Sequence, residues 1–171
     1  MTQFFTYQGF SLRRAGLHIR VLITAFLLVA AVALAVGVLN YWVRTGLTPI
    51  GAARYLRGDG IDLLEKSPLE LLDATHPHLF GQAFFFFVLC HLFALVPARS
   101  TLKLWVYVAA FLSVLTDAAS PWLIRYVSPA FGVLQIAGTV TMTAVFLMLV
   151  GWPLREMWFR DPGPRAAAPP R

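Results

Sequence analysis

The stretch VLITAFLLVAAVALAVGVL, at Val21–Leu39, decides the fold class. It contains no charged side chain, and as a helix it is about 28 Å long, close to the roughly 30 Å of a bilayer core. A cleaved secretory signal is disfavoured, because the apolar run of such a signal is only about 7–15 residues long. We therefore predict a transmembrane helix here.

Three further apolar blocks follow, at Leu79–Val96, Leu104–Ile124 and Ala130–Trp152. The chain is 58% hydrophobic and 13% charged, whereas soluble domains carry about 25% charged residues. Its 14% aromatic content also excludes a disordered chain. The sequence thus predicts an all-α bundle of four transmembrane helices. The predicted parts are an N-terminal segment 1–20, a membrane domain 21–159 with spans 21–43, 77–97, 102–124 and 129–154, an outer loop 44–76, and a disordered tail 160–171.

The distribution of Lys and Arg predicts the orientation, because cytoplasmic loops carry the excess of these residues. The two predicted sides hold nine and five of them, which places both termini in the cytoplasm of a bacterial inner membrane. The richer side has Arg13, Arg14, Arg20, Arg99, Lys103, Arg155, Arg160, Arg165 and Arg171, and the poorer side has Arg44, Arg54, Arg57, Lys66 and Arg125.

The outer loop 44–76 carries signals for two short interfacial helices. Thr48 and Pro49 suit a helix start, with Gly58 as a stop. The segment Ser67–Glu70 is a capping box with proline at the first helical position. Because Pro77 disfavours helical geometry in the residue before it, we expect the second span to begin there, with His76 at its cap.

Several function classes are disfavoured by the composition. The single cysteine, Cys90, excludes an internal disulfide and a multi-cysteine metal site. The net charge of +6 is concentrated at segment ends, as in membrane proteins, so a nucleic-acid partner is not predicted. Phosphate-loop, nucleophile-elbow and metalloprotease motifs are absent from the sequence, so no catalytic residue is predicted and an enzyme is disfavoured.

Three histidines accompany the second span and are candidate cofactor ligands. His76 and His78 would lie at the positive end of a helix dipole, which favours the neutral imidazole that binds a metal or haem iron. His91 lies about 20 Å further along the helix. The predicted cofactor-binding residues are therefore His76, His78, His91 and Gln82, with His76 and His78 as metal ligands. An interfacial hydrogen-bonding pair of histidines is the alternative.

The nature of the ligand stays open between haem b, a metal ion and a quinone. A bis-histidine haem needs an opposing ligand, and the third and fourth spans contain no histidine. A two-haem cytochrome within one chain is therefore disfavoured, while one haem or ligands shared in an oligomer remain open. Phe80, Phe84 and Phe87 fall on the His91 face, where they would line a quinone site or pack against lipid and neighbouring helices.

Asp117 is the most informative single residue, because a carboxylate inside a bilayer costs about 2.5–3.5 kcal/mol and needs a partner. We predict an intramembrane polar group of Asp117, Ser120 and Arg125, at the level of His78 and Gln82. One interpretation is a proton or ligand site. The other is a structural hydrogen bond between spans.

Small residues predict helix contacts within the bundle. Ala33 and Gly37 form a small-xxx-small step in the first span. A second stripe lies on the fourth span and includes Gly132, Gln135, Thr139 and Thr143.

Several short motifs are spread over about residues 44–159. With them the chain resembles a family of small four-span proteobacterial inner-membrane proteins of uncharacterised function. The resemblance implies a bacterial inner-membrane location and transfers no catalytic residue. The motifs are THPHLF at Thr75–Phe80 with His91 in the same span, SPWLIRY at Ser120–Tyr126, PAF at Pro129–Phe131 and LREMWF at Leu154–Phe159.

The leading functional hypothesis is a multi-pass inner-membrane protein that binds haem, a metal or a quinone, or serves as an accessory subunit of an electron-transfer complex. Its partners would be the lipid bilayer and respiratory-chain subunits or further copies of the chain. One alternative is a structural or assembly protein without a cofactor. The other is a small proton-coupled transporter that uses Asp117, which four spans support poorly unless the protein oligomerises.

Overall fold

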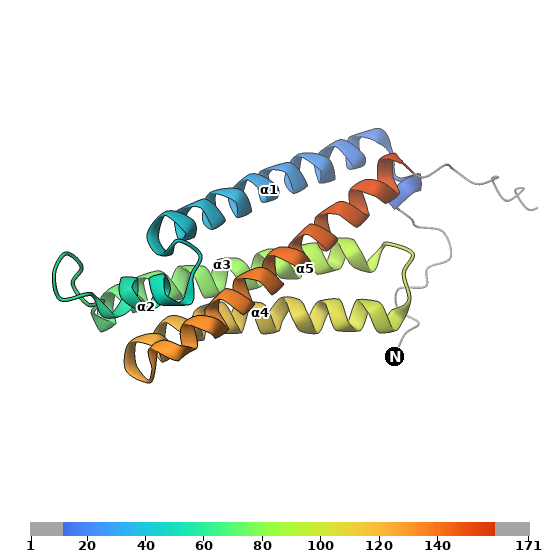
Figure 1. Ribbon diagram of the computed structural model, residues 1–171. Coiled ribbons are helices and arrows are strands. Elements are labelled where there is room, and N and C mark those ends of the chain that lie inside the picture. Colours follow the sequence, from blue (N-terminus) through green and yellow to red (C-terminus); the bar gives the residue numbers. More distant parts are fainter. Residues whose placement is uncertain (1–11, 160–171) are drawn as a thin grey trace, which may run out of the picture.

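A computed structural model describes residues 12–159 as a bundle of long helices (Figure 1). Four of these helices are long and apolar enough to cross a membrane, and residues 12–159 contain no strand. The predicted all-α four-helix bundle is confirmed. The tail 160–171 and most of the segment 1–20 lie outside the described residues. The elements are η1 (Leu12–Arg14), α1 (Leu17–Thr45), α2 (Pro49–Arg57), α3 (Pro68–Ala94), α4 (Ser100–Tyr126), η2 (Pro129–Phe131) and α5 (Gly132–Trp158).

The first helix turns sharply into the short helix α2, as the sequence predicts. Gly46 ends α1 with φ 63°, a conformation that favours glycine. Thr48 then caps α2, and its hydroxyl accepts the Gly51 amide at 3.0 Å. Pro49 occupies the first helical position and Gly58 follows the last one. One of the two short helices predicted after the first span is therefore confirmed.

The second predicted interfacial helix is wrong as a separate element. Its capping box forms, with Ser67 Oγ accepting the Glu70 amide at 3.2 Å and the Glu70 carboxylate accepting the Ser67 amide at 2.9 Å. The helix that starts there continues through Pro77 to Ala94. Pro77 removes only the hydrogen bond to the Asp73 carbonyl, and a long transmembrane helix tolerates this loss. The second span is therefore part of a helix that begins nine residues earlier than predicted.

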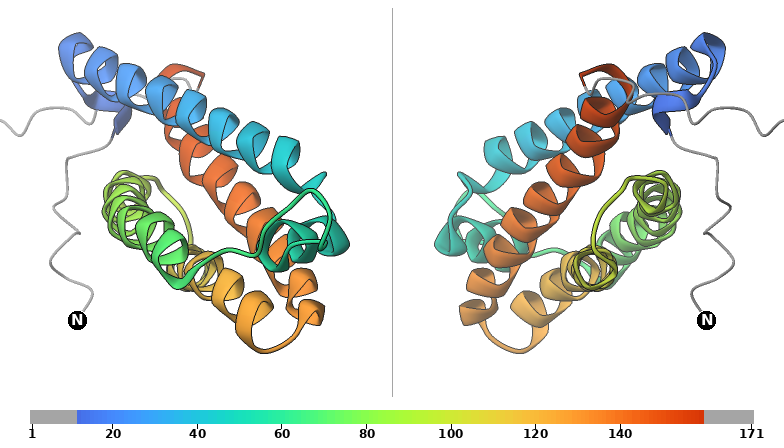
Figure 2. Two further views of the ribbon diagram at one scale, coloured as in Figure 1. Left: turned by 90° about the vertical axis from the view of Figure 1, so that its left-hand side faces the viewer. Right: turned by 90° about the vertical axis from the view of Figure 1, so that its right-hand side faces the viewer.

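The long helices pack unequally. The main core joins α3, α4 and α5, and its fully buried side chains include Leu89, Phe93 and Phe146. Figure 2 shows that α1 instead crosses the outside of α5, apart from α4. In the most apolar 18-residue stretch of α1, only 11% of the residues are buried in the bundle. Most of the α1 surface is therefore left to contact lipid.

Small residues make close contacts on α5 but not on α1. A Cβ atom added to Gly138 would lie 2.8 Å from Thr116 Cγ2, and one on Gly132 would lie 2.5 Å from the Pro49 carbonyl oxygen. The predicted stripe on the fourth span is thus a true contact surface. Ala33 and Gly37 are exposed, so their predicted contact is wrong within a single chain. Ala33 and Gly37 face outward, because α1 contacts α5 through the opposite face of the helix.

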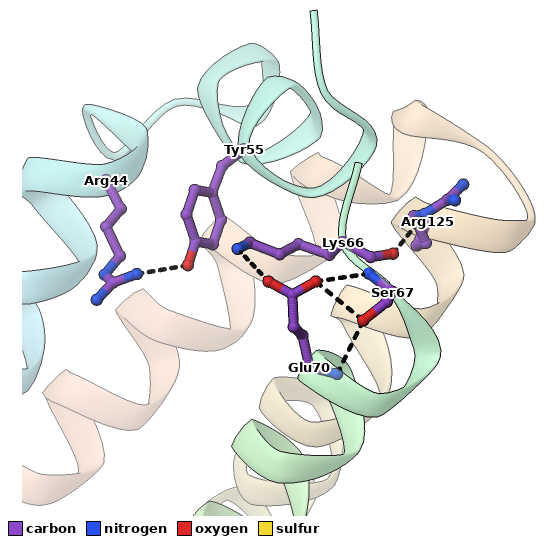
Figure 3. Close-up of polar contacts among 6 residues, drawn as sticks. All are labelled: Arg44, Tyr55, Lys66, Ser67, Glu70 and Arg125. Atoms are coloured by element: carbon purple, nitrogen blue, oxygen red, sulfur yellow. Dashed lines mark hydrogen bonds and ion pairs between the residues drawn. The ribbon is translucent and has the colours of Figure 1, made fainter. Parts of the chain in front are cut away.

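Polar contacts tie α2 and the following loop to the ends of α1, α3 and α4 (Figure 3). Tyr55 accepts a hydrogen bond from Arg44 at 2.5 Å, and its ring also faces Lys66. Lys66 pairs with Glu70 at 2.7 Å and offers its carbonyl to Arg125 Nε at 2.9 Å. Because the pairing with Glu70 favours its charged form, the pKa of Lys66 is raised. We call this side of the molecule the α2 end.

Asp59 organises the loop that follows α2. Its carboxylate accepts the amides of Ile61, Asp62 and Leu63 at 3.0, 2.9 and 2.9 Å and pairs with Arg54 at 2.5 Å. The Leu63 amide, followed by the Ile61 amide and the Arg54 guanidinium, holds the pKa of Asp59 well below its usual range. The loop is therefore a fixed part of the α2 end.

Candidate functional site

The histidines on α3 do not converge. His76 and His78 lie inside the helix and not at its start, so neither imidazole sits at the positive end of the dipole as predicted. His78 Nδ1 is 2.8 Å from the Ala74 carbonyl, and His91 Nδ1 is 2.9 Å from the Phe87 carbonyl. Residues 12–159 hold no group of three His, Cys, Asp or Glu side chains that could bind a metal. The arrangement therefore gives no support to a histidine-ligated metal or haem site among these residues.

The phenylalanine stripe of α3 accompanies His91 on an outward face. Phe80, Phe84 and Phe87 are 75%, 64% and 51% exposed. The Phe87 ring contacts the His91 imidazole, with centroids 4.1 Å apart. Side chains this exposed do not enclose a flat cofactor within the chain. The stripe instead presents aromatic surface to lipid or to a neighbouring protein.

The interior polar site is centred on Asp117. The Gln82 amide on α3 donates to the Asp117 carboxylate on α4 at 3.1 Å, so the two predicted residues do meet. Asp117 also lies within electrostatic range of Tyr41 on α1 and of His78 on α3. Asp117 is nine residues from the end of α4 at Tyr126, which places it about 13 Å from the α2 end.

Further polar side chains lie at this level with oxygens that are buried and unpaired. These oxygens are Tyr41 Oη, Gln82 Oε1, Ser120 Oγ and Gln135 Oε1, none of which has a hydrogen-bond partner within residues 12–159. Ser120 is 0% exposed and Gln135 is 7% exposed. We call Tyr41, Gln82, Asp117, Ser120 and Gln135 the polar cluster.

The register of α4 against α5 places Gln135 beside Ser120. The two helices are antiparallel, and Gly138 packs directly on Thr116. Moving one turn toward the α2 end on each helix brings Ser120 opposite Gln135. Gln82, Asp117, Ser120 and Gln135 therefore lie in the interior between α3, α4 and α5, where leaving a buried polar group unpaired costs about 1–3 kcal/mol.

A proline adds a backbone oxygen to this region. Pro121 lies within α4 and has no amide hydrogen, so it cannot bond the carbonyl of Asp117 four residues earlier. The helix continues through Pro121, so only this one carbonyl is left to find another partner. Asp117 therefore offers two kinds of oxygen at one position of α4, its carboxylate and the backbone carbonyl that Pro121 cannot bond.

Arg125 does not reach the polar cluster. It forms an ion pair with Glu65 at 2.8 Å and a hydrogen bond to the Lys66 carbonyl, both at the α2 end. Sequence reasoning grouped it with Asp117 because both lie on α4, but eight residues separate them along the helix. Arg125 therefore fixes the loop before α3 and leaves Asp117 without its positive charge.

The central and C-terminal parts of the chain match a known protein family. The sequence profile of a transmembrane helical domain matches residues 46–164, more than two thirds of the chain. The chain belongs to this family of transmembrane helical domains. No curated protein and no solved structure matches the chain.

The matched transmembrane helical domain covers α2 to α5 and starts where α1 ends. It contains Gln82, Asp117, Ser120 and Gln135, whereas Tyr41 comes from outside it. The resemblance inferred over residues 44–159 to a family of membrane proteins is confirmed. Four of the five residues of the polar cluster thus lie in the family domain, and the fifth, Tyr41, lies on α1.

The sequence patterns did not identify two members of the polar cluster, Tyr41 and Gln135. Tyr41 stands near the end of its span, where an aromatic residue is an ordinary interfacial anchor. Gln135 was assigned to the packing stripe of the fourth span with Gly132. The available signal was its amide, which is the most polar side chain in that part of α5 and needs a partner when buried.

Proposed function

We propose that the protein is a small membrane module in which Asp117 carries an exchangeable positive charge, as in proton-coupled transport. The observation that carries the proposal is a carboxylate inside the bundle whose hydrogen-bond partner is the neutral amide of Gln82. An isolated ionised carboxylate at low dielectric is strongly unfavourable, so the group must bind a proton or another cation.

The basic side chains near the α2 end are engaged elsewhere. Among residues 12–159, no Lys or Arg forms an ion pair with Asp117. The compensating charge is therefore not supplied by a Lys or Arg side chain of these residues. His78 is exposed and turns its Nδ1 to the Ala74 carbonyl, so we infer that the charge on Asp117 can exchange. The basic groups bond to other sites: Arg44 to Tyr55, Arg54 to Asp59, Arg57 to the Ile124 carbonyl, Lys66 to Glu70, and Arg125 to Glu65.

The other ligands suggested by the sequence find less support. A haem or a histidine-bound metal needs convergent histidines, and His76, His78 and His91 are all exposed on α3. A quinone offers carbonyl oxygens and needs hydrogen-bond donors. The polar cluster has donors in the Tyr41 and Ser120 hydroxyls, but its charged group is the Asp117 carboxylate, which only accepts and would repel a quinone carbonyl oxygen.

The proposal is tested by proton entry into sealed proteoliposomes. The chain is reconstituted at equal density as wild type, Asp117→Asn and His91→Ala, and an inside-negative potential is imposed while a trapped dye reports internal pH. We expect acidification by wild type and by His91→Ala, and the protein-free rate for Asp117→Asn, because the asparagine amide cannot take the proton. Equal rates for Asp117→Asn and wild type would reject the proposal.

A second candidate is the accessory-subunit role, which the exposed stripe of α3 favours. Phe80, Phe84, Phe87 and His91 recur at spacings of four, three and four residues. This is the seam spacing of paired helices with a crossing angle of about +20°. A partner helix of a larger membrane complex would fit this seam, while the polar cluster would keep its role within the bundle.

A further inference from the structure

We propose that the polar cluster binds a monovalent alkali cation, of the size of Na⁺, when Asp117 is deprotonated. This inference rests on the proposed function, because it names a charge that can replace the proton on Asp117. It follows from the type, number and charge of the oxygens that the four long helices bring together.

The chemistry of the polar cluster is that of a hard-cation site. All the unpaired atoms in it are oxygens, from amide and hydroxyl groups, and hard cations prefer such ligands. Imidazole and thiolate ligands, which transition metals prefer, do not contribute: His78 is exposed and turns its Nδ1 to the Ala74 carbonyl. Cys90 lies eight residues beyond Gln82, more than two helical turns away.

The charge of the polar cluster matches one positive charge. Asp117 is its single carboxylate, whereas dedicated divalent sites combine more acidic ligands. The titratable groups within electrostatic range of Asp117 are Tyr41 on α1 and His78 on α3, and neither forms an ion pair or a hydrogen bond with it among residues 12–159. The helix α5 has no ionisable side chain before Arg155. A monovalent cation therefore neutralises the site without leaving a surplus charge in the bilayer.

The proline within α4 supports the same ligand. Pro121 cannot donate to the Asp117 carbonyl, and backbone carbonyl oxygens are ligands that hard cations accept. Ser120 gives independent support, since its hydroxyl is fully buried on the same helix and unpaired. A purely structural serine would bond its own helix, as Ser113 does with the Ala110 carbonyl at 2.7 Å.

The two buried serines of α4 provide a matched experiment. Thermal unfolding of the purified full chain in detergent is followed at about pH 8 with NaCl or with choline chloride at equal ionic strength, because a cation that binds the folded state raises Tm. Wild type and Ser113→Ala should be stabilised by Na⁺ over choline. In Ser120→Ala and Gln135→Leu the Na⁺ concentration for half-maximal shift should rise about tenfold or more, and Asp117→Asn should show no Na⁺ shift.

The outcomes separate this inference from the proposed function. If wild type shows the same Tm in NaCl, KCl and choline chloride, the cation site is rejected, while proton entry through Asp117 can still be observed in proteoliposomes. An unchanged Na⁺ shift in Ser120→Ala and Gln135→Leu would equally reject it. A Na⁺ shift without Asp117-dependent proton entry would support the cation site and reject proton coupling. Ser120→Ala removes only an unpaired hydroxyl, so it tests the site even if Asp117→Asn does not fold.

Discussion

Replacing Gly132 by alanine is expected to lower the free energy of unfolding by about 1–3 kcal/mol, the cost typical of overpacking. The new Cβ atom would lie 2.5 Å from the Pro49 carbonyl oxygen and 3.0 Å from its Cα atom. These are backbone atoms, which cannot rotate away. The helix α2 cannot retreat either, because Ala52 and Leu56 are buried in a core with Ile124. Unfolding in mixed micelles titrated with SDS measures the loss.

Gly151 is the matched control for Gly132. It also lies in α5, but a Cβ atom there would meet nothing within 4 Å. Alanine at this position should be neutral or raise the free energy of unfolding by about 0.5–1 kcal/mol, through its better helix propensity. If Gly132→Ala were as stable as Gly151→Ala, α2 would not be seated on α5 as described.

Replacing Phe146 by alanine should cost about 3 kcal/mol, at the lower end of the range for a buried phenylalanine. Phe146 is 1% exposed and stacks on Phe85, with ring centroids 5.9 Å apart. Packing dominates this loss, because apolar side chains gain little by leaving lipid for a protein core. The same SDS titration measures the effect.

Phe84→Ala is the control for Phe146→Ala. Phe84 is 64% exposed on the outer face of α3. Its removal should change the free energy of unfolding by no more than about 0.5 kcal/mol, the usual range for surface substitutions. An equal loss in the two variants would contradict a lipid-facing Phe84 and would indicate that another chain covers the seam.

The elements that the sequence predicted well are those with a local physical cause. The charge-free run Val21–Leu39 predicts a span because each charge in the bilayer core is costly. The capping residues Thr48 and Ser67 predict helix starts because their side chains satisfy orphan amides of the next turn. Asp117 and Gln82 could be paired because both are polar, near the same depth and on adjacent spans.

The predictions that failed depended on how the helices pack. Pro77 predicts a helix start, but a transmembrane helix is held by its remaining backbone bonds and continues through this proline. The small residues Ala33 and Gly37 suggested a contact, but sequence does not determine which face of α1 meets α5. Tyr41 lies on α1, which packs on α5 outside the main core, and no local pattern encodes where that helix packs.

The most direct test of the central claim is the infrared spectrum of the Asp117 carboxyl group in lipid. Difference spectra of wild type and Asp117→Asn are recorded in H₂O and in D₂O, without alkali cations. We predict a protonated-carboxyl band in wild type that shifts to lower frequency on exchange into D₂O and is absent from Asp117→Asn. A band that is identical in the two proteins, or that does not shift in D₂O, would contradict an exchangeable charge on Asp117.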